Sequence, residues 1–341
     1  MAPPEGDYSQ GKDAMAYVHT GDKLGLGADN KNPCFIENPD NIPKPGLFGI
    51  RWGKTPGEID NLNRLVDAKC QYFLEESHRT GVPLSPEVEY VLKTGKPSTV
   101  YKERYTFWPV VAGIGHLANV AYQFYMDPFA SICVILFSWL YYDLFSGVLH
   151  VVHDNPIMIQ IPVVSEPTLE FQWHHHIPQD LTSKSFLEVC GDLNTVTTLI
   201  FIVYCNPIGP YDFTKNATAM TIISWKFLFA YFGQLCHAMS HMPYYRRPEW
   251  INSLQKMGLM VSPKEHWGHH KNYDDNYCIG SGIWNPVLTP FLKLTNKIHI
   301  ALGSTENASS YCWLVGFLCM AVLDVPLITH VFTDVLRISR R

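Results

Sequence analysis

The sequence predicts an all-α integral membrane protein with four, or five, transmembrane helices and a histidine-rich metal site at one membrane face. Hydrophobic residues make up 47% of the 341 residues and charged residues only 17%, whereas a soluble domain carries about 25% charged residues. Several apolar segments approach the length of about 20 residues that a membrane-spanning helix needs. Ten of the fifteen histidines gather in four short clusters at or just after the ends of these segments.

Residues 1–105 are expected to form a soluble N-terminal extension, because Pro, Gly and Asp are frequent there. Two helices are predicted within it, Pro56–Glu76 and Pro86–Thr94. The first thirty residues contain five acidic side chains and no apolar run, which argues against a signal peptide and against an Arg-rich transit peptide. No clear cleavable targeting sequence is therefore predicted, and the ER, plastid and mitochondrial membranes remain alternatives.

The membrane domain is expected over residues 106–300, and residues 301–341 form a C-terminal apolar segment with a basic tail. The spans predicted in the membrane domain are Phe107–Met126, Phe129–Val152, Leu193–Ile208 and Ala219–Ala238. The third of these is short for a span. A fifth would be Tyr311–Phe332, but it would carry the terminal arginines away from the face that holds the other basic residues, which counts against a crossing there.

This topology brings all four histidine clusters to one face of the membrane. Two crossings place the first cluster on the side of the N-terminus, and two more return the chain to that side before the third. The loops that carry the second and fourth clusters begin there as well. Residues 242–300 contain seven Lys and Arg residues, so the positive-inside rule places this face in the cytosol, matrix or stroma.

The clusters supply nitrogen and carboxylate donors at regular spacing. The first and third end apolar segments, and the second and fourth are expected in polar loops. They read His150-Val151-Val152-His153-Asp154, Trp173-His174-His175-His176, His237-Ala238-Met239-Ser240-His241 and His266-Trp267-Gly268-His269-His270. Residues four apart share one face of a helix and can direct two donors at one ion. The pairs with this spacing are His150 with Asp154, His237 with His241, and His266 with His270.

The number of donors predicts two metal ions. Imidazole suits iron, copper, zinc and nickel, so the residue type alone does not select the metal. A structural zinc is satisfied by four ligands, fewer than the nine or ten donors in these clusters. Non-haem iron is the usual choice for oxygen chemistry, and hydrogen abstraction from an unactivated C–H bond is work for the metal. The expected metal ligands are His150, His153, Asp154, His174, His175, His237, His241, His266, His269 and His270.

Asp143 is predicted to support this site from within the second span. It precedes His150 by seven residues, which is about two turns of an α-helix. Ionisable groups inside a membrane are costly and mark functional sites. We therefore expect the Asp143 carboxylate to accept the free N–H of a ligand histidine.

Four spaced motifs carry a resemblance to a known family. The motif D-x-x-S-G-x-x-H-x-x-x-D runs from Asp143 to Asp154, F-x-x-H-H-x-x-P-x-x-x-T begins at Phe171, and Q-x-x-H-x-x-x-H begins at Gln234. The motif H-x-x-H-H begins at His266 and is followed by N-Y-C-I-x-S-G-x-W-N over Asn276–Asn285. Together they resemble the Kua-type lipid desaturases, which include plasmanylethanolamine desaturases and plastid phosphatidylglycerol palmitate desaturases. The segment Leu254–Leu259 is similar to the plastid branch.

The resemblance implies a membrane di-iron desaturase that introduces a double bond into an acyl or alkyl chain of a membrane lipid. Oxygen would be the co-substrate, and an external carrier such as cytochrome b5 or ferredoxin would donate electrons. His153 and His176 are additional to the motifs. The motif histidines, expected to be catalytic, are His150, His174, His175, His237, His241, His266, His269 and His270.

Two alternatives to a desaturase remain open. An oxygen-dependent lipid hydroxylase could use the same histidine scaffold, because the two reactions share the first hydrogen abstraction. A desaturase-like structural subunit of a larger membrane complex is the other alternative, with the N-terminal extension as the surface for a partner. No basic stripe suggests a nucleic-acid partner.

Overall fold

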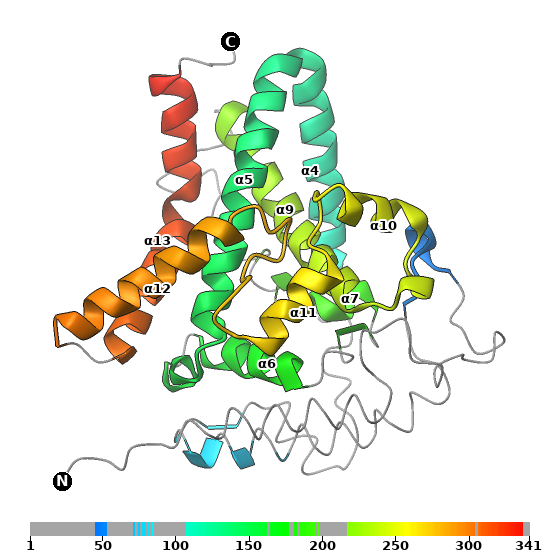
Figure 1. Ribbon diagram of the computed structural model, residues 1–341. Coiled ribbons are helices and arrows are strands. Elements are labelled where there is room, and N and C mark those ends of the chain that lie inside the picture. Colours follow the sequence, from blue (N-terminus) through cyan, green and yellow to red (C-terminus); the bar gives the residue numbers. More distant parts are fainter. Residues whose placement is uncertain are drawn as a thin grey trace, which may run out of the picture.

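The structure, a computed structural model, describes residues 45–52, part of 71–84, 107–161, 164–176, 181–182, 185–191, 193, 194, 197, 217–303 and 306–336. Every regular element in these ranges is a helix (Figure 1), which confirms the predicted all-α class. The expected helix Pro86–Thr94 lies outside the described residues, as does most of Pro56–Glu76 and of the expected span Leu193–Ile208.

Four long helices form the body of the molecule. Helix α4 (Phe107–Met126) and helix α5 (Pro128–His153) run antiparallel as a hairpin (Figure 1). Helix α9 (Ala217–His241) packs on both, and helix α13 (Glu306–His330) packs on α5 and α9 before it continues into a π-helical turn, η8 (Val331–Val335). The long helices therefore coincide with four of the predicted apolar segments.

Local chemistry explains where α5 begins. The preceding Asp127 caps the helix, because its carboxylate accepts a hydrogen bond from the backbone N–H of Ala130 at 2.9 Å. Pro128 follows at the first helical position, where its missing N–H costs no hydrogen bond. The turn between α4 and α5 is therefore set by two adjacent residues, and the apolar run that follows is entirely helical.

Two segments in the described part of the chain are long and apolar enough to cross a membrane, namely α5 and Ala308–Val335. Helix α4 adds an inverted pattern. It buries His116 and Gln123 and exposes Phe107, Ile114 and Tyr125. A helix in water would place these residue types the other way round, whereas lipid favours apolar side chains outside and polar ones toward the bundle interior.

Short helices cover the end of the bundle where α5 and α9 terminate. Helix η4 (Pro156–Gln160) and helix α6 (Ser165–His176) follow α5. After α9 come η7 (Tyr244–Arg246), α10 (Glu249–Lys256), α11 (Pro263–Lys271) and α12 (Asn285–Ala301). The segments η3 (Leu47–Gly49) and α7 (Phe186–Val189) complete the described elements. Figure 1 shows α6 and α11 at the end of the bundle opposite the turn between α4 and α5.

Two histidine clusters that were expected in polar loops lie on helices instead. The second cluster ends α6, and the fourth lies within α11. A capping box starts α11, since the Ser262 hydroxyl accepts from the Glu265 N–H at 3.2 Å and the Glu265 carboxylate accepts from the Ser262 N–H at 3.1 Å. Pro263 follows this cap. These three residues start a helix that hydrophobic periodicity does not reveal.

Candidate metal centre

Eight histidines and Asp154 meet where α5 and α9 end against α6 and α11. The donor atoms of seven of these histidines and of Asp154 fall into two groups, and within each group all of them lie within 4.8 Å of one another. The five-histidine group consists of His174, His237, His241, His266 and His270. The carboxylate group consists of Asp154, His175 and His269. The structure thus brings residues from all four sequence clusters together.

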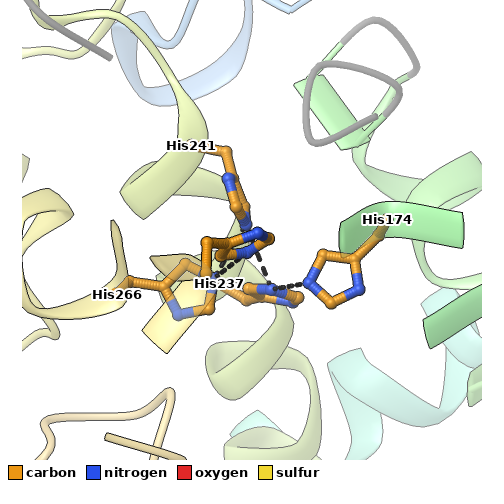
Figure 2. Close-up of side chains that lie close together, drawn as sticks. His174, His237, His241 and His266 are labelled. Carbon is orange, nitrogen blue, oxygen red and sulfur yellow. Dashed lines mark hydrogen bonds between the residues drawn. The ribbon is translucent and has the colours of Figure 1, made fainter. Parts of the chain in front are cut away.

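Ring nitrogens within the five-histidine group face one another, as Figure 2 shows for His174, His237, His241 and His266. The Nε2 atom of His237 lies 3.1 Å from that of His174 and 3.3 Å from that of His241. The His266 Nε2 atom lies 2.8 Å from His241 Nε2 and 3.2 Å from His270 Nε2. These imidazoles come from three different helices, α6, α9 and α11, and they converge on one point between them.

Hydrogen bonds to the backbone orient two of the rings in the two groups. The Nδ1 atom of His174 lies 2.8 Å from the Phe171 carbonyl, and that of His269 lies 2.7 Å from the Asp275 carbonyl. A carbonyl oxygen only accepts, so each of these Nδ1 atoms carries a proton, which leaves Nε2 as the ring nitrogen that can face a metal ion. Holding the distal ring nitrogen in this way is how proteins orient metal-binding histidines.

His150 lies between the two groups. Its Nδ1 atom donates to the Ser146 carbonyl at 3.0 Å. Its Nε2 atom is buried and has no hydrogen-bond partner among the described residues. Its ring centroid lies 5.4 Å from that of His237 and 5.7 Å from that of His269. A buried lone pair without a partner is costly, and a metal ion beside it would satisfy it.

Asp154 gives the carboxylate group its negative charge. Its Oδ1 atom lies 2.9 Å from His175 Nε2, and its Oδ2 atom lies 3.1 Å from His269 Nε2. Burial alone would raise the pKa of Asp154, but the neighbouring His175 and His269 outweigh burial and hold that pKa well below its ordinary value. The carboxylate is therefore ionised, which is the form that binds a cation.

Burial keeps the surrounding imidazoles neutral. It is the main reason why the pKa values of His174, His266 and His270 lie well below the ordinary histidine value, and neighbouring imidazoles lower them further. The pKa of His175 is also lowered by burial, although Asp154 opposes the shift. Neutral imidazole is the form that ligates metals. Converging lone pairs, neutral rings and an ionised carboxylate all fit a metal site.

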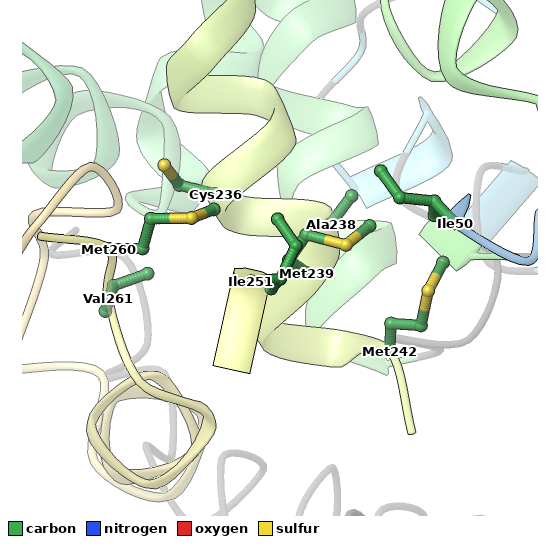
Figure 3. Packing of buried hydrophobic residues seen from close by; sticks show 8 residues of the cluster. All are labelled: Ile50, Cys236, Ala238, Met239, Met242, Ile251, Met260 and Val261. Carbon is green, nitrogen blue, oxygen red and sulfur yellow. The ribbon is translucent and has the colours of Figure 1, made fainter. Parts of the chain in front are cut away.

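A buried apolar cluster holds the end of α9 that carries His237 and His241 (Figure 3). Its members are Ile50, Cys236, Ala238, Met239, Met242, Ile251, Met260 and Val261. Ile50, from the N-terminal part of the chain, belongs to this cluster. The same part is also held by the Trp250 indole N–H, which donates to the Phe48 carbonyl at 3.0 Å. The side chains that alternate with the two histidines on α9 are therefore fixed in a packed core.

The structure does not bring His153 into either group. Its Nδ1 atom lies 3.1 Å from the Thr168 hydroxyl oxygen, and its ring packs against Phe171 and Phe317. These neighbours are a hydroxyl and two aromatic rings, which explains the burial of His153 without a metal. The side chain of His176, the other histidine outside the motifs, lies outside the described residues.

Among the described residues, Asp143 accepts no histidine N–H, contrary to the expectation. The Ser146 carbonyl takes the Nδ1 proton of His150 instead. The Asp143 Oδ1 atom accepts from the backbone N–H groups of Ser281 and Gly282, at 2.6 Å and 3.2 Å. Position 280 must be glycine here, because a Cβ atom on it would lie 2.6 Å from the same oxygen.

Asp143 instead ties α5 to the segment Asn276–Asn285. The Trp284 indole N–H adds a bond to the Leu140 carbonyl at 2.7 Å. Within this segment, the ring of Tyr277 packs 5.3 Å from that of His269. This support for a candidate metal ligand was missed by reasoning from the sequence, although the motifs at Asp143 and Asn276 contain all the residues involved.

An apolar cavity of about 490 Å³ reaches the five-histidine group. His174 and His237 belong both to this group and to the cavity wall. The wall runs from them between α5, α9 and α13, where aromatic residues such as Phe145, Phe229 and Phe317 line it. The cavity therefore joins the candidate metal centre to the interior of the helix bundle.

Comparison with known proteins identifies a family. The lipid desaturase domain matches residues 139–313. Fatty acid desaturase 4, chloroplastic, of Arabidopsis thaliana is 36% identical over 148 residues, which are 43% of this chain and 44% of that protein. Fatty acid desaturase 4-like 1, chloroplastic, of the same plant is 33% identical over 178 residues, 50% of this chain and 57% of that protein.

A mammalian protein is similar as well. Plasmanylethanolamine desaturase 1 of Mus musculus is 26% identical over 182 residues, 50% of this chain and 66% of that protein. The chain spans between 44% and 57% of the length of the plant relatives. No solved structure matches it. Because the lipid desaturase domain covers more than half of the chain and includes both groups of donor side chains, the protein belongs to the Kua-type lipid desaturase family.

Proposed function

We propose that the protein is a membrane di-iron lipid desaturase that introduces a double bond into an acyl or alkyl chain of a membrane lipid. It would use oxygen as co-substrate and electrons from an external carrier such as cytochrome b5 or ferredoxin. The observation that carries this proposal is that His174 and His237 line both the candidate metal centre and the apolar cavity. A chain in the cavity would therefore lie next to the donor side chains.

The two donor groups suggest how two irons would be held. The five-histidine group would hold one ion, and Asp154, His175 and His269 would hold the other, with His150 between them. Mixed histidine and carboxylate donors suit non-haem iron. When bound, the irons would supply the oxygen-dependent removal of hydrogen from unactivated C–H bonds, for which side chains alone have no chemistry.

The protein's own residues would orient the chain and exclude water. Aromatic side chains along the cavity, such as Phe145 and Phe229, provide the apolar surface against which an alkyl chain packs. A closed apolar wall around the reacting carbon also limits side reactions with water. Overall, the chain would lose two hydrogens, and these would combine with oxygen, two electrons from the carrier and two protons to form two waters.

Further observations support a membrane location for this reaction and indicate the kind of chain that it would act on. The two apolar segments and the inverted pattern of α4 support a membrane location, with the metal centre at one membrane face. The positive-inside rule favours the cytosol, matrix or stroma for that face. The relatives named as chloroplastic are 32–36% identical, against 26% for plasmanylethanolamine desaturase 1, which favours an acyl chain.

Expression in a host that lacks the activity tests the proposal. Total lipid would be compared by mass spectrometry between cells that make the wild-type protein and cells that make the His241→Ala variant. A lipid that has lost two hydrogens only with the wild-type protein supports desaturation. A gain of one oxygen would instead indicate the hydroxylase, and unchanged lipid despite full iron loading would indicate a structural subunit.

A further inference from the structure

Lys226 and Asp324 form an ion pair inside the helix bundle. The Lys226 Nζ atom lies 2.8 Å from the Asp324 Oδ2 atom, and only 11% of the Lys226 side chain and 1% of the Asp324 side chain are exposed. The Tyr142 hydroxyl donates to Asp324 Oδ2 at 2.9 Å, and Lys226 also donates to the Ala321 carbonyl at 2.7 Å. The pair therefore links α5, α9 and α13.

Stability alone does not explain an ion pair in this place. Asp324 lies within Ala308–Val335, one of the two segments apolar enough to cross a membrane. Removing two charges from water costs about as much as their attraction returns, so apolar side chains of similar volume stabilise a bundle at least as well. Charged groups inside a membrane-spanning bundle mark a function.

Lys226 of this pair lines the cavity that reaches the candidate metal centre. Tyr142 and Ala321 line that cavity too, as does His237. Lys226 precedes His237 by eleven residues on α9, so the helical rise separates them by about 16 Å. The wall between them is largely aromatic and aliphatic, with Phe229, Ala230 and Gly233 on α9.

A second polar group lies close to Lys226. His116 lines it, and the Nδ1 atom of His116 lies 3.0 Å from the Ser224 hydroxyl oxygen. The His116 ring packs 4.7 Å from that of Phe227, the residue after Lys226. The cavity wall thus includes the candidate donors His174 and His237, and a mostly apolar stretch of α9 separates His237 from the hydrogen-bonded Lys226. His116 lines the cavity close to Lys226.

We infer that the Lys226–Asp324 pair, with Tyr142, is the floor of the chain-binding cavity and sets the longest lipid chain that fits beyond the reacting carbon. This inference rests on the proposed function. Each methylene of a chain gains by leaving water for an apolar wall. A methylene that pressed against the ion pair would strip hydrogen bonds from charged groups and return none. The lipid chain therefore extends no further into the cavity than the ion pair.

Variants that move the floor in opposite directions test this inference. Lys226→Ala combined with Asp324→Ala removes both charges together, so that neither is left buried alone, and it lengthens the cavity. Ala230→Phe fills the cavity one helical turn closer to His237. The matched control is His330→Ala with Asp334→Ala, because these residues form an exposed, hydrogen-bonded pair at the end of the same apolar segment, outside the cavity.

The measurement is the chain-length profile of the desaturated lipids in a host fed saturated fatty acids of different lengths. The wild type and the control should share one upper length limit. The double alanine variant should accept longer chains, with a gain of about tenfold in product for each added methylene. Ala230→Phe should favour shorter chains.

Two outcomes would overturn the inference, and they are distinguishable. Desaturation with the wild-type length profile in Ala230→Phe, or in a folded double alanine variant, would show that this pair is not the floor. If the double alanine variant does not accumulate, Lys226→Met with Asp324→Leu, which removes both charges at similar side-chain volume, decides in its place: acceptance of longer chains supports the inference, and the wild-type profile overturns it. Absence of any desaturated lipid with the iron-loaded wild type would instead reject the proposed function itself.

Discussion

Asp154 Oδ1 lies 2.9 Å from His175 Nε2, although the two residues are 21 positions apart and belong to different segments. Asp154 ends α5, whereas His175 lies near the end of α6. The other carboxylate oxygen of Asp154 lies 3.1 Å from His269 on α11. One carboxylate therefore holds three helices in register at the centre of the candidate metal site.

Asp154→Asn should lower the metal content of the purified protein while the fold is kept. Asparagine preserves the volume but removes the negative charge that faces the cation in the carboxylate group. We expect metal affinity at this group to fall by at least about 10–100-fold, with loss of one ion per chain by mass spectrometry of metals. Asp274→Asn is the control, because Asp274 is an exposed carboxylate near the same cluster. Equal metal content in both variants would show that Asp154 is not a ligand.

His241→Ala and His153→Ala should differ sharply. His241 belongs to the five-histidine group, with its Nε2 atom 2.8 Å from that of His266, whereas His153 contacts Thr168 and two phenylalanine rings. The first variant should lose metal and desaturase activity, and the second should keep its metal. Metal content and lipid product are measured on the same preparations. An equal loss of metal and of lipid product in His153→Ala would indicate that His153 is a metal ligand.

Asp143→Leu should destabilise the protein more than Asp143→Asn does. Leucine leaves the buried N–H of Ser281 without an acceptor, and an unsatisfied buried group costs about 1–3 kcal/mol. Asparagine keeps the Oδ1 acceptor. We expect a lower unfolding temperature in detergent for the leucine variant, together with weaker metal binding, because the tied segment packs on His269. A leucine variant as stable as the asparagine variant would contradict this anchoring role.

Gly147→Ala should be destabilising, in contrast to Gly115→Ala. A Cβ atom at position 147 would lie 2.5 Å from both the Cys278 sulfur and the Leu288 side chain. Overpacking of this kind costs about 1–3 kcal/mol. Nothing in the described part of the chain lies within 4 Å of a Cβ at position 115, so alanine there should be neutral or slightly stabilising. Thermal unfolding of both variants measures the difference, and equal unfolding temperatures would refute the close contact.

The long helices could be predicted from the sequence because their signal is local. The run of apolar residues over Phe129–Val152 identifies α5 almost to its ends. The two donor pairs on single helices, such as His237 with His241, follow equally from helical spacing. The short helices α6 and α11 have no such signal, since their histidines and charged residues mask any apolar face, and packing against the bundle stabilises them instead.

The hydrogen-bond partners of individual side chains could not be predicted, because they depend on how the helices pack against one another. Helical spacing pairs Asp154 with His150, but the Asp154 carboxylate contacts His175 near the end of α6. Helical spacing also places Asp143 about two turns before His150 on α5. The group that takes the Nδ1 proton of His150 is, however, the backbone carbonyl of Ser146 within the same helix. Lys226 and Asp324 are visible as charged residues within two apolar runs, but they are 98 positions apart and helical spacing does not reveal that they pair.

The metal content of the purified wild-type protein tests the two-group centre most directly. The full chain would be prepared in detergent with iron supplied during expression, and its metals would be quantified against protein concentration. Two donor groups with histidine and carboxylate ligands predict about two iron ions per chain. One tightly held zinc per chain and no iron would contradict a di-iron centre.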